Sequence, residues 1–244
     1  MIPKLHSWLF SALLVAAGAL SGAAAMAPVR VYTVPVAPWT FPKEPERGVA
    51  SEYLRYFFDA AGVPVSLGTL PYLRVINGLR DGSNAAAILI PDAERDVFAL
   101  RLCQVTSIRS GVLYKKSRFS ALSLERLGGL TVGIQRGTHA LDKLLDIPGF
   151  HPYLTDSIEQ GLRMLEIDRL DAAFLSNPGS DSLLRAAGLS ATDYGWLEVA
   201  VQPVVIYVSR KSPLAQDAAA LQRLRAVCGG SGRAVMERLM LEYR

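Results

Sequence analysis

Short apolar segments alternate with amphipathic helical segments along most of the chain, and this alternation limits the folds that it can adopt. Residues 29–36, 85–90 and 130–134 have the apolar composition of buried strands. Between them, apolar side chains recur every three or four residues, for example from Gly48 to Ala61, which predicts helices. The pattern therefore predicts an α/β fold with mostly parallel strands.

The alternation occurs in two successive blocks. The first ends with two strands expected near residues 102–108 and 111–114, after a polar loop at 91–96. The second begins near residue 130, and two helices close the chain. Crossover points at 115–117 and 208–211 predict two lobes. Lobe 1 comprises residues 26–115 plus 209–244, and lobe 2 comprises 116–208.

The N-terminal residues have the three parts of a secretory signal. Lys4 and His6 give a positive flank, residues 8–20 are almost wholly apolar, and small residues occupy 21–25. The apolar run is shorter than the roughly 18–20 residues that a spanning helix needs. The sequence therefore predicts a signal peptide at residues 1–25 that is cleaved after Ala24 or Ala25, and an exported protein.

Charge and motifs exclude several functions. The net charge of +4 is spread along the chain without a block of Lys and Arg, so no nucleic-acid partner is expected. The chain has no HExxH, GxSxG, Walker or GxGxxG motif, and its mature part keeps only His139 and His151. A catalytic triad whose residues are distant in sequence and meet only in the fold remains an alternative. No metal or cofactor is predicted.

The two cysteines, Cys103 and Cys228, leave two alternatives open. Export would place them in an oxidising compartment, where a disulfide is permitted. Two buried thiols are the other reading. Two cysteines without a supporting His cluster do not make a zinc site.

Three stretches carry candidate binding residues. At Gly137-Thr138 a strand runs into a helix start, whose free N–H groups can bind an anion, although an ordinary helix cap has the same sequence. Arg95 follows a buried strand and can bind a carboxylate bidentately, or pair with a nearby surface acid. The remaining candidates are aromatic residues and an arginine at strand ends and helix starts, which can wall a ligand pocket or pack in the core: Trp39, Phe41, Tyr72 and Arg74.

These segments together resemble family 3 of the periplasmic solute-binding proteins, which include the polar amino acid receptors of ABC importers. The resemblance covers nearly the whole mature chain. Its most specific segment is LGGLTVGIQRGT (residues 127–138), and RLDAAFL (169–175) also fits. The supporting segments are PWTF (38–41), GVASEYLRYFFDAAG (48–62), PYLRVINGLRDG (71–82) before AAAIL (85–89), and the loop with Arg95.

The resemblance implies a periplasmic binding protein-like fold, with two α/β lobes, a central ligand cleft and two crossover strands. It implies that Arg95 and Gly137-Thr138 take a ligand carboxylate. Where the family has an Asp for the ligand ammonium, this chain has Ser176-Asn177. A neutral amide cannot offset a buried ammonium, so a carboxylate-bearing or neutral polar solute, with Asn177 among its contacts, is expected rather than a standard α-amino acid.

The resemblance further implies a monomeric, non-enzymatic periplasmic protein that delivers its solute to a membrane ABC permease. It also implies that the C-terminal helices pack on the first lobe, which would pair Cys103 with Cys228. Two alternatives remain. One is an enzyme on the same fold, similar to cyclohexadienyl dehydratase, and the other is a soluble sensor partner of a membrane receptor.

Overall fold

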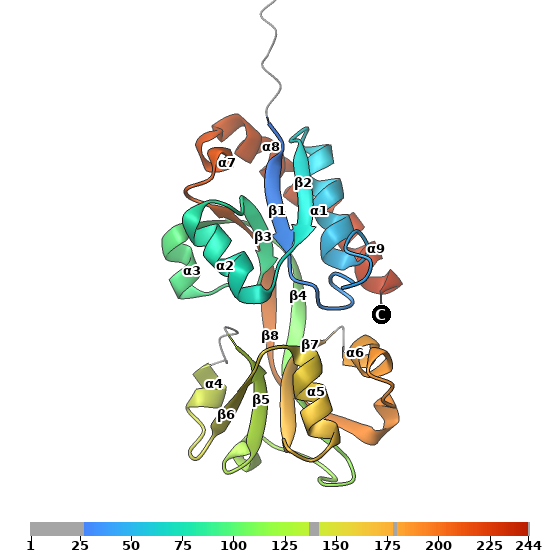
Figure 1. Ribbon diagram of the computed structural model, residues 1–244. Helices are drawn as coiled ribbons and strands as arrows, with labels where there is room; N and C mark the ends of the chain where they lie inside the picture. Colours follow the sequence, from blue (N-terminus) through green and yellow to red (C-terminus); the bar gives the residue numbers. More distant parts are fainter. Residues whose placement is uncertain (1–26, 137–141, 178–179, 244) are drawn as a thin grey trace, which may run out of the picture.

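The chain forms two α/β lobes that are joined by two long strands (Figure 1). The computed structural model describes residues 27–136, 142–177 and 180–243. The predicted signal peptide at residues 1–25 lies outside the described residues. In the described part of the chain, no helix is long and apolar enough to cross a bilayer.

The strands and helices follow the predicted alternation. The strands are β1 (Val29–Thr33), β2 (Val65–Thr69), β3 (Ala86–Leu89), β4 (Ala99–Lys115), β5 (Thr131–Gln135), β6 (His151–Thr155), β7 (Ala172–Asn177) and β8 (Tyr194–Ser209). The α-helices are α1 (Val49–Ala60), α2 (Tyr72–Asp81), α3 (Ala93–Phe98), α4 (Asp142–Leu145), α5 (Ile158–Glu166), α6 (Ser180–Ala186), α7 (Pro213–Gln216), α8 (Ala218–Gly229) and α9 (Ser231–Glu242).

Local sequence signals explain where several helices begin and end. Helix α2 begins after Pro71 and ends at Gly82, which adopts the left-handed conformation (φ 91°) that favours glycine. Helix α5 begins at Ser157, whose hydroxyl accepts the Gln160 N–H at 3.1 Å. These ends were expected from the turn and cap residues alone.

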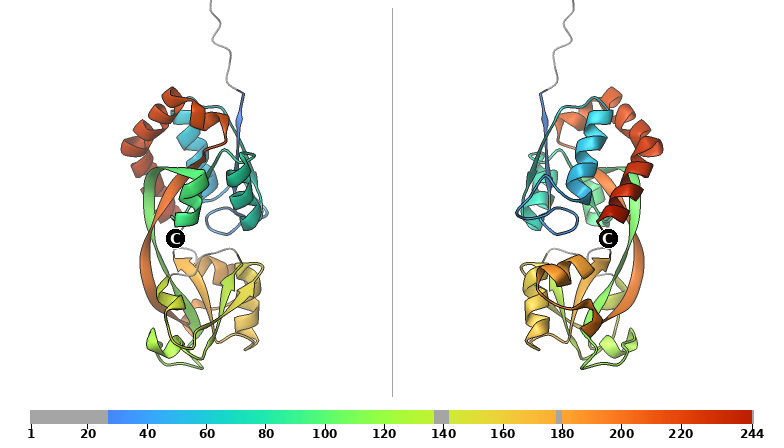
Figure 2. Two further views of the ribbon diagram at one scale, coloured as in Figure 1. Left: turned by 90° about the vertical axis from the view of Figure 1, so that its left-hand side faces the viewer. Right: turned by 90° about the vertical axis from the view of Figure 1, so that its right-hand side faces the viewer.

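The strands β4 and β8 pair with each other in antiparallel orientation and run through both lobes. Figure 2 shows this pair along one side of the molecule, with the lobes extending from it. In the six-stranded sheet the order is β3-β8-β4-β7-β5-β6, and β1 pairs separately with β2. The expected parallel pairing occurs in β1–β2, β5–β6 and β5–β7, whereas the pairs made by β4 and β8 are antiparallel.

The two strands expected near residues 102–108 and 111–114 are a single strand, β4, of 17 residues. Gly111 lies inside this strand, where its lack of a side chain serves packing. A Cβ at this position would collide with the Leu197 carbonyl and the Trp196 ring of β8. Residues 194–209 likewise form one long strand, β8.

One further prediction was wrong, and one strand was missed. The expected polar loop at 91–96 contains helix α3, because the Asp92 side chain accepts the Arg95 N–H at 3.2 Å and caps it. Strand β6 was not expected at all. It is an edge strand whose first four residues are exposed, so its sequence lacks an apolar period.

Each lobe has helices on both faces of its strands. In the first lobe, α1, α8 and α9 cover one apolar cluster, and α2 covers another. Full burial of Phe57 and Phe58 of α1 stabilises the first cluster by roughly 1.5–3 kcal/mol per side chain. Two separate clusters hold the second lobe together.

The changeover between lobes occurs inside the long strands. Along β4, Ile108 belongs to a first-lobe cluster and Val112 to a second-lobe cluster. Along β8 the corresponding residues are Val204 and Val199. The division at 115/116 and 208/209 stays a prediction about the folding units.

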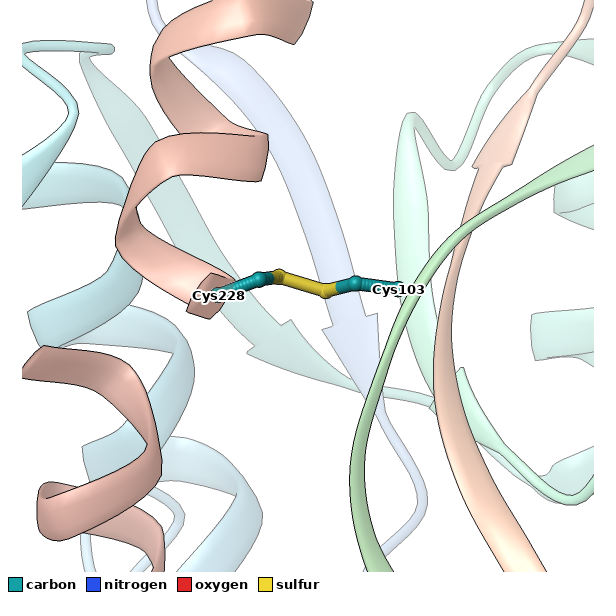
Figure 3. Close-up of a disulfide and its surroundings, with 2 residues drawn as sticks. All are labelled: Cys103 and Cys228. Atoms are coloured by element: carbon teal, nitrogen blue, oxygen red, sulfur yellow. A yellow bond between two sulfur atoms is a disulfide. The ribbon is translucent and has the colours of Figure 1, made fainter. Parts of the chain in front are cut away.

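A disulfide joins Cys103 of β4 to Cys228 of α8, across 125 residues of sequence (Figure 3). The expected pairing is therefore confirmed. Both cysteines pack against the first-lobe cluster beneath α1, α8 and α9. The bond thus ties the C-terminal helices to the strand that continues into the second lobe.

Replacing both cysteines, as Cys103→Ser with Cys228→Ser, is expected to lower the free energy of unfolding by about 2–4 kcal/mol, because the unfolded chain loses its cross-link. Urea unfolding followed by circular dichroism measures this change. Reduced wild-type protein is the control and should match the double variant. Equal midpoints for oxidised and reduced wild type would contradict the prediction.

Candidate ligand-binding site

A cavity of about 170 Å³ lies between the two lobes. The first lobe contributes the end of β1, the following loop, the starts of α1 and α2, and the end of β3. The second lobe contributes the ends of β5 and β7, the start of α5, and α6. Carboxyl ends of strands from both lobes therefore converge on the cavity, which is the usual place for ligands in α/β proteins.

The cavity wall is mainly apolar. Ile88 and Ile90 line it from β3 and the residue after that strand, and Phe174, Leu175 and Leu183 line it from the second lobe. Ile108 of β4 and Val204 of β8 add apolar surface from the crossover strands. None of the described lining residues is Asp, Glu, Lys, Arg or His.

Side chains of the first lobe also reach across to the second. Val36, in the loop after β1, packs against the second-lobe cluster that contains Leu175 and Leu183. Because residues of both lobes enclose the same space, the cavity depends on the distance between the lobes.

A few polar side chains lie among the apolar residues of the cavity wall. Ser176, near the end of β7, has its Oγ 3.4 Å from Ser110 Oγ. The Ser110 hydroxyl donates to Gln202 Oε1 at 2.6 Å, so this group links β7, β4 and β8. Gln135 at the end of β5 and Tyr72 at the start of α2 also line the cavity.

Arg95 is buried, with 5 % of its surface exposed, and lies behind Tyr72. Its Nη2 donates to the Tyr72 hydroxyl at 2.6 Å, and its Nη1 donates to the Ile90 carbonyl. The guanidinium carbon is 5.9 Å from the centre of the Tyr72 ring. Its Nε has no hydrogen-bond partner within the described part of the chain. The positive charge is therefore one side chain removed from the cavity wall.

The Tyr72 hydroxyl is placed to act as a donor. Burial raises the pKa of Tyr72, and the opposing effect of Arg95 is smaller, so the phenol is protonated at neutral pH. Its oxygen already accepts the Arg95 N–H, which leaves its own hydrogen free to donate. Tyr72, which lines the cavity, therefore offers a phenol donor that is hydrogen-bonded to a buried positive charge.

The predicted binding residues of the first lobe fall into three groups. Trp39 and Tyr72 line the cavity, whereas Arg95 reaches it through Tyr72. Phe41 packs 5.8 Å from the Tyr243 ring, and the Arg74 side chain is exposed on α2, so neither lines the cavity. Their ligand contacts stay predictions.

The second-lobe candidates are less defined. Asn177 is the last residue of β7, where its Cα pairs with that of Arg109. Gly137 and Thr138 lie outside the described residues. Their roles toward a ligand likewise stay predictions.

Sequence reasoning missed several lining residues, among them Gln135, Ile158 and Leu183. Gln135 had a usable signal, because it ends a buried strand at the edge where the other strands also end. Ile158 and Leu183 had none, since apolar residues on helices read as core. Among the described residues, no group of three or more His, Cys, Asp or Glu side chains could hold a metal ion.

Solved structures share this fold at low sequence identity. A substrate-binding protein of an amino acid ABC transporter matches with a TM-score of 0.74 and 16 % identity, over 89 % of this chain and 99 % of that one. The arginine-, lysine-, histidine-binding protein ArtJ of Geobacillus stearothermophilus matches with a TM-score of 0.72 and 16 % identity, over 87 % and 94 %.

A histidine kinase sensor domain with similarity to periplasmic binding proteins also matches, with a TM-score of 0.74 and 17 % identity, over 86 % and 95 %. No protein-family model and no curated protein matches the chain. The chain therefore has the periplasmic binding protein-like fold that its sequence predicted, and at these identities the likeness shows the fold alone.

Helix α3, which carries Arg95, is held in place by the next residue, Asp96. The Asp96 carboxylate accepts from Arg101 Nε at 2.6 Å and from the Tyr207 hydroxyl at 2.9 Å. The hydrogen bonds from Arg101, with a smaller one from Tyr207, lower the pKa of Asp96. Because the folded-state pKa is lowered, the stabilisation is present above the unfolded-state pKa and is lost as the pH falls through the folded-state value.

Asp96→Asn should therefore lower the free energy of unfolding at pH 7, and its difference from wild type should shrink as the pH falls below about 4. Urea unfolding at several pH values measures both quantities. Asp59→Asn, at an exposed position on α1, is the control. A difference for Asp96→Asn that stays constant down to pH 2 would contradict the assignment.

Proposed function

We propose that this protein binds a small carboxylate-bearing solute between its lobes, closes on it by a hinge motion and delivers it to a membrane ABC importer. The observation that carries the proposal is Tyr72 in the wall of an inter-lobe cavity, with its hydroxyl hydrogen-bonded to the buried Arg95 guanidinium. A phenol donor backed by a positive charge suits an anionic oxygen.

The long strands support the hinge motion. Only β4 and β8 continue from one lobe into the other, among the strands described. Bending near the changeover between Ile108 and Val112 would change the distance between the cavity walls. Closure around a ligand by such hinges is a common mechanism of two-lobed binding proteins.

Binding suits the cavity better than catalysis does. General acid–base chemistry on this fold would need an ionisable side chain against the substrate. The described part of the wall offers Tyr72 and neutral polar groups for this purpose, and no carboxylate or imidazole. The enzyme alternative therefore has less support than solute binding.

Export to the periplasm is part of the proposal. It rests on the signal peptide predicted at residues 1–25, and the Cys103–Cys228 disulfide is consistent with an oxidising compartment. The substrate-binding protein of an amino acid ABC transporter that shares this fold is consistent with it as well.

The similarity to a histidine kinase sensor domain favours a second candidate, a ligand sensor that acts on a membrane receptor. Uptake of labelled ligand by cells that lack the protein separates the two. The importer role predicts that uptake is lost and returns with a plasmid copy. Unchanged uptake, together with a lost ligand-induced transcriptional response, would support the sensor role instead.

Tyr72→Phe is expected to weaken binding of a carboxylate ligand by roughly 10- to 100-fold, because it removes a hydrogen bond to a charged group while it keeps the ring. Isothermal titration calorimetry measures the affinity, and small-angle X-ray scattering measures the compaction on binding. The control is Tyr56→Phe, a hydroxyl loss on α1 outside the cavity wall. Unchanged affinity for Tyr72→Phe would remove this hydroxyl from the site.

A further inference from the structure

The remainder of the cavity wall narrows the ligand further. We infer that the solute is an amine-free acid with an apolar body, such as a branched aliphatic or aryl-substituted monocarboxylate. This inference rests on the proposed function and adds two statements to it. The ligand lacks an ammonium group, and the part beyond its carboxylate is hydrocarbon.

The first statement follows from the charges around the cavity. An ammonium in a closed cavity needs a carboxylate beside it, because an unpaired buried charge is costly. Ser176 stands near the end of β7, where its hydroxyl lies 3.4 Å from that of Ser110. The described wall offers no carboxylate, and the buried charge of Arg95 behind Tyr72 would repel a cation.

The second statement follows from the side chains that face the ligand body. Isoleucines of the first lobe and of β4 (Ile88, Ile90 and Ile108) face Phe174, Leu175 and Leu183 of the second lobe across the same cavity. A second polar or charged group on the ligand would lose its hydration against these side chains without gaining a partner. A hydrocarbon body gains from the same contact.

The size of the cavity agrees with a small ligand. Its volume of about 170 Å³ lies below the roughly 300–1,000 Å³ that is typical of sites for drug-sized ligands. A monocarboxylate with a short branched or aryl-substituted chain is small enough for a cavity of about 170 Å³.

Matched ligands test the two statements on the purified, oxidised protein by isothermal titration calorimetry. 4-Methylpentanoate and L-leucine differ only in the α-ammonium, and 3-phenylpropanoate and L-phenylalanine form a second such pair. Glutarate replaces the apolar body by a second carboxylate. At least one amine-free monocarboxylate is expected to bind at least tenfold more tightly than its amino acid partner and than glutarate.

Variants at Ser176 test the ammonium statement directly. Ser176→Asp places a carboxylate at the cavity and should shift the preference toward the amino acid of each pair by at least tenfold. Ser176→Asn is the matched neutral control and should leave the preference for the amine-free acid. Circular dichroism and the unfolding midpoint verify that both variants fold, and the wild-type ligand pairs test the inference independently of them.

The outcomes separate this inference from the proposed function. Tighter binding of L-leucine or L-phenylalanine would overturn the ammonium statement, and tighter binding of glutarate would overturn the apolar body. In both cases the proposed function, binding of a carboxylate-bearing solute, would remain supported. Binding of 3-phenylpropanamide in preference to 3-phenylpropanoate would instead overturn the carboxylate of the proposed function. If none of these compounds binds, the inference is overturned, whereas a broad metabolite screen by thermal shift still tests solute binding itself.

Discussion

The antiparallel pairing of β4 with β8 is the constraint on which the rest of the structure depends. These strands are hydrogen-bonded from Ala99 to Lys115 and from Tyr194 to Ser209, and each continues from one lobe into the other. Because both lobes add their other strands to this pair, the strand ends of the two lobes face each other across one space. The disulfide at Cys103 fixes the first-lobe part of β4 to the C-terminal helices. The proposed hinge motion would then take place in the strand segments beyond this bond.

The same arrangement determines the chemistry of the cavity. Ile90, Gln135 and Ser176 are distant in sequence, but the strand ends bring all three residues to the wall of the cavity. Helix α3 holds Arg95 beside the cavity. Its guanidinium already donates hydrogen bonds to the Ile90 carbonyl and the Tyr72 hydroxyl, so it does not meet a ligand directly. The positive charge acts through a tyrosine, and the surface that meets a ligand directly is mostly hydrocarbon. This combination is the basis of our inference that the ligand is an amine-free acid with an apolar body.

Much of the fold was predictable because its signals are local. The amphipathic period of α1, the glycine stop of α2 at Gly82 and the serine cap of α5 each act within a few residues. Predictions failed where a contact between residues distant in sequence determines the local structure. Separate strands were expected at 102–108 and 111–114, but β4 is continuous there, and Gly111 leaves room for the Trp196 ring of β8. The edge strand β6 carries no apolar period because its first four residues are exposed.

The sequence by itself determined the alternation of strands and helices, the two-lobed fold class and the candidates Trp39 and Tyr72. These features depend on periodicity, caps and composition, which a single chain displays directly. Only the tertiary structure decided that β4 and β8 are continuous and that Arg95 is one side chain removed from the cavity. Each of these depends on which distant residues become neighbours. The exposure and partners of a side chain such as Arg95 are set by that packing and not by its own sequence surroundings.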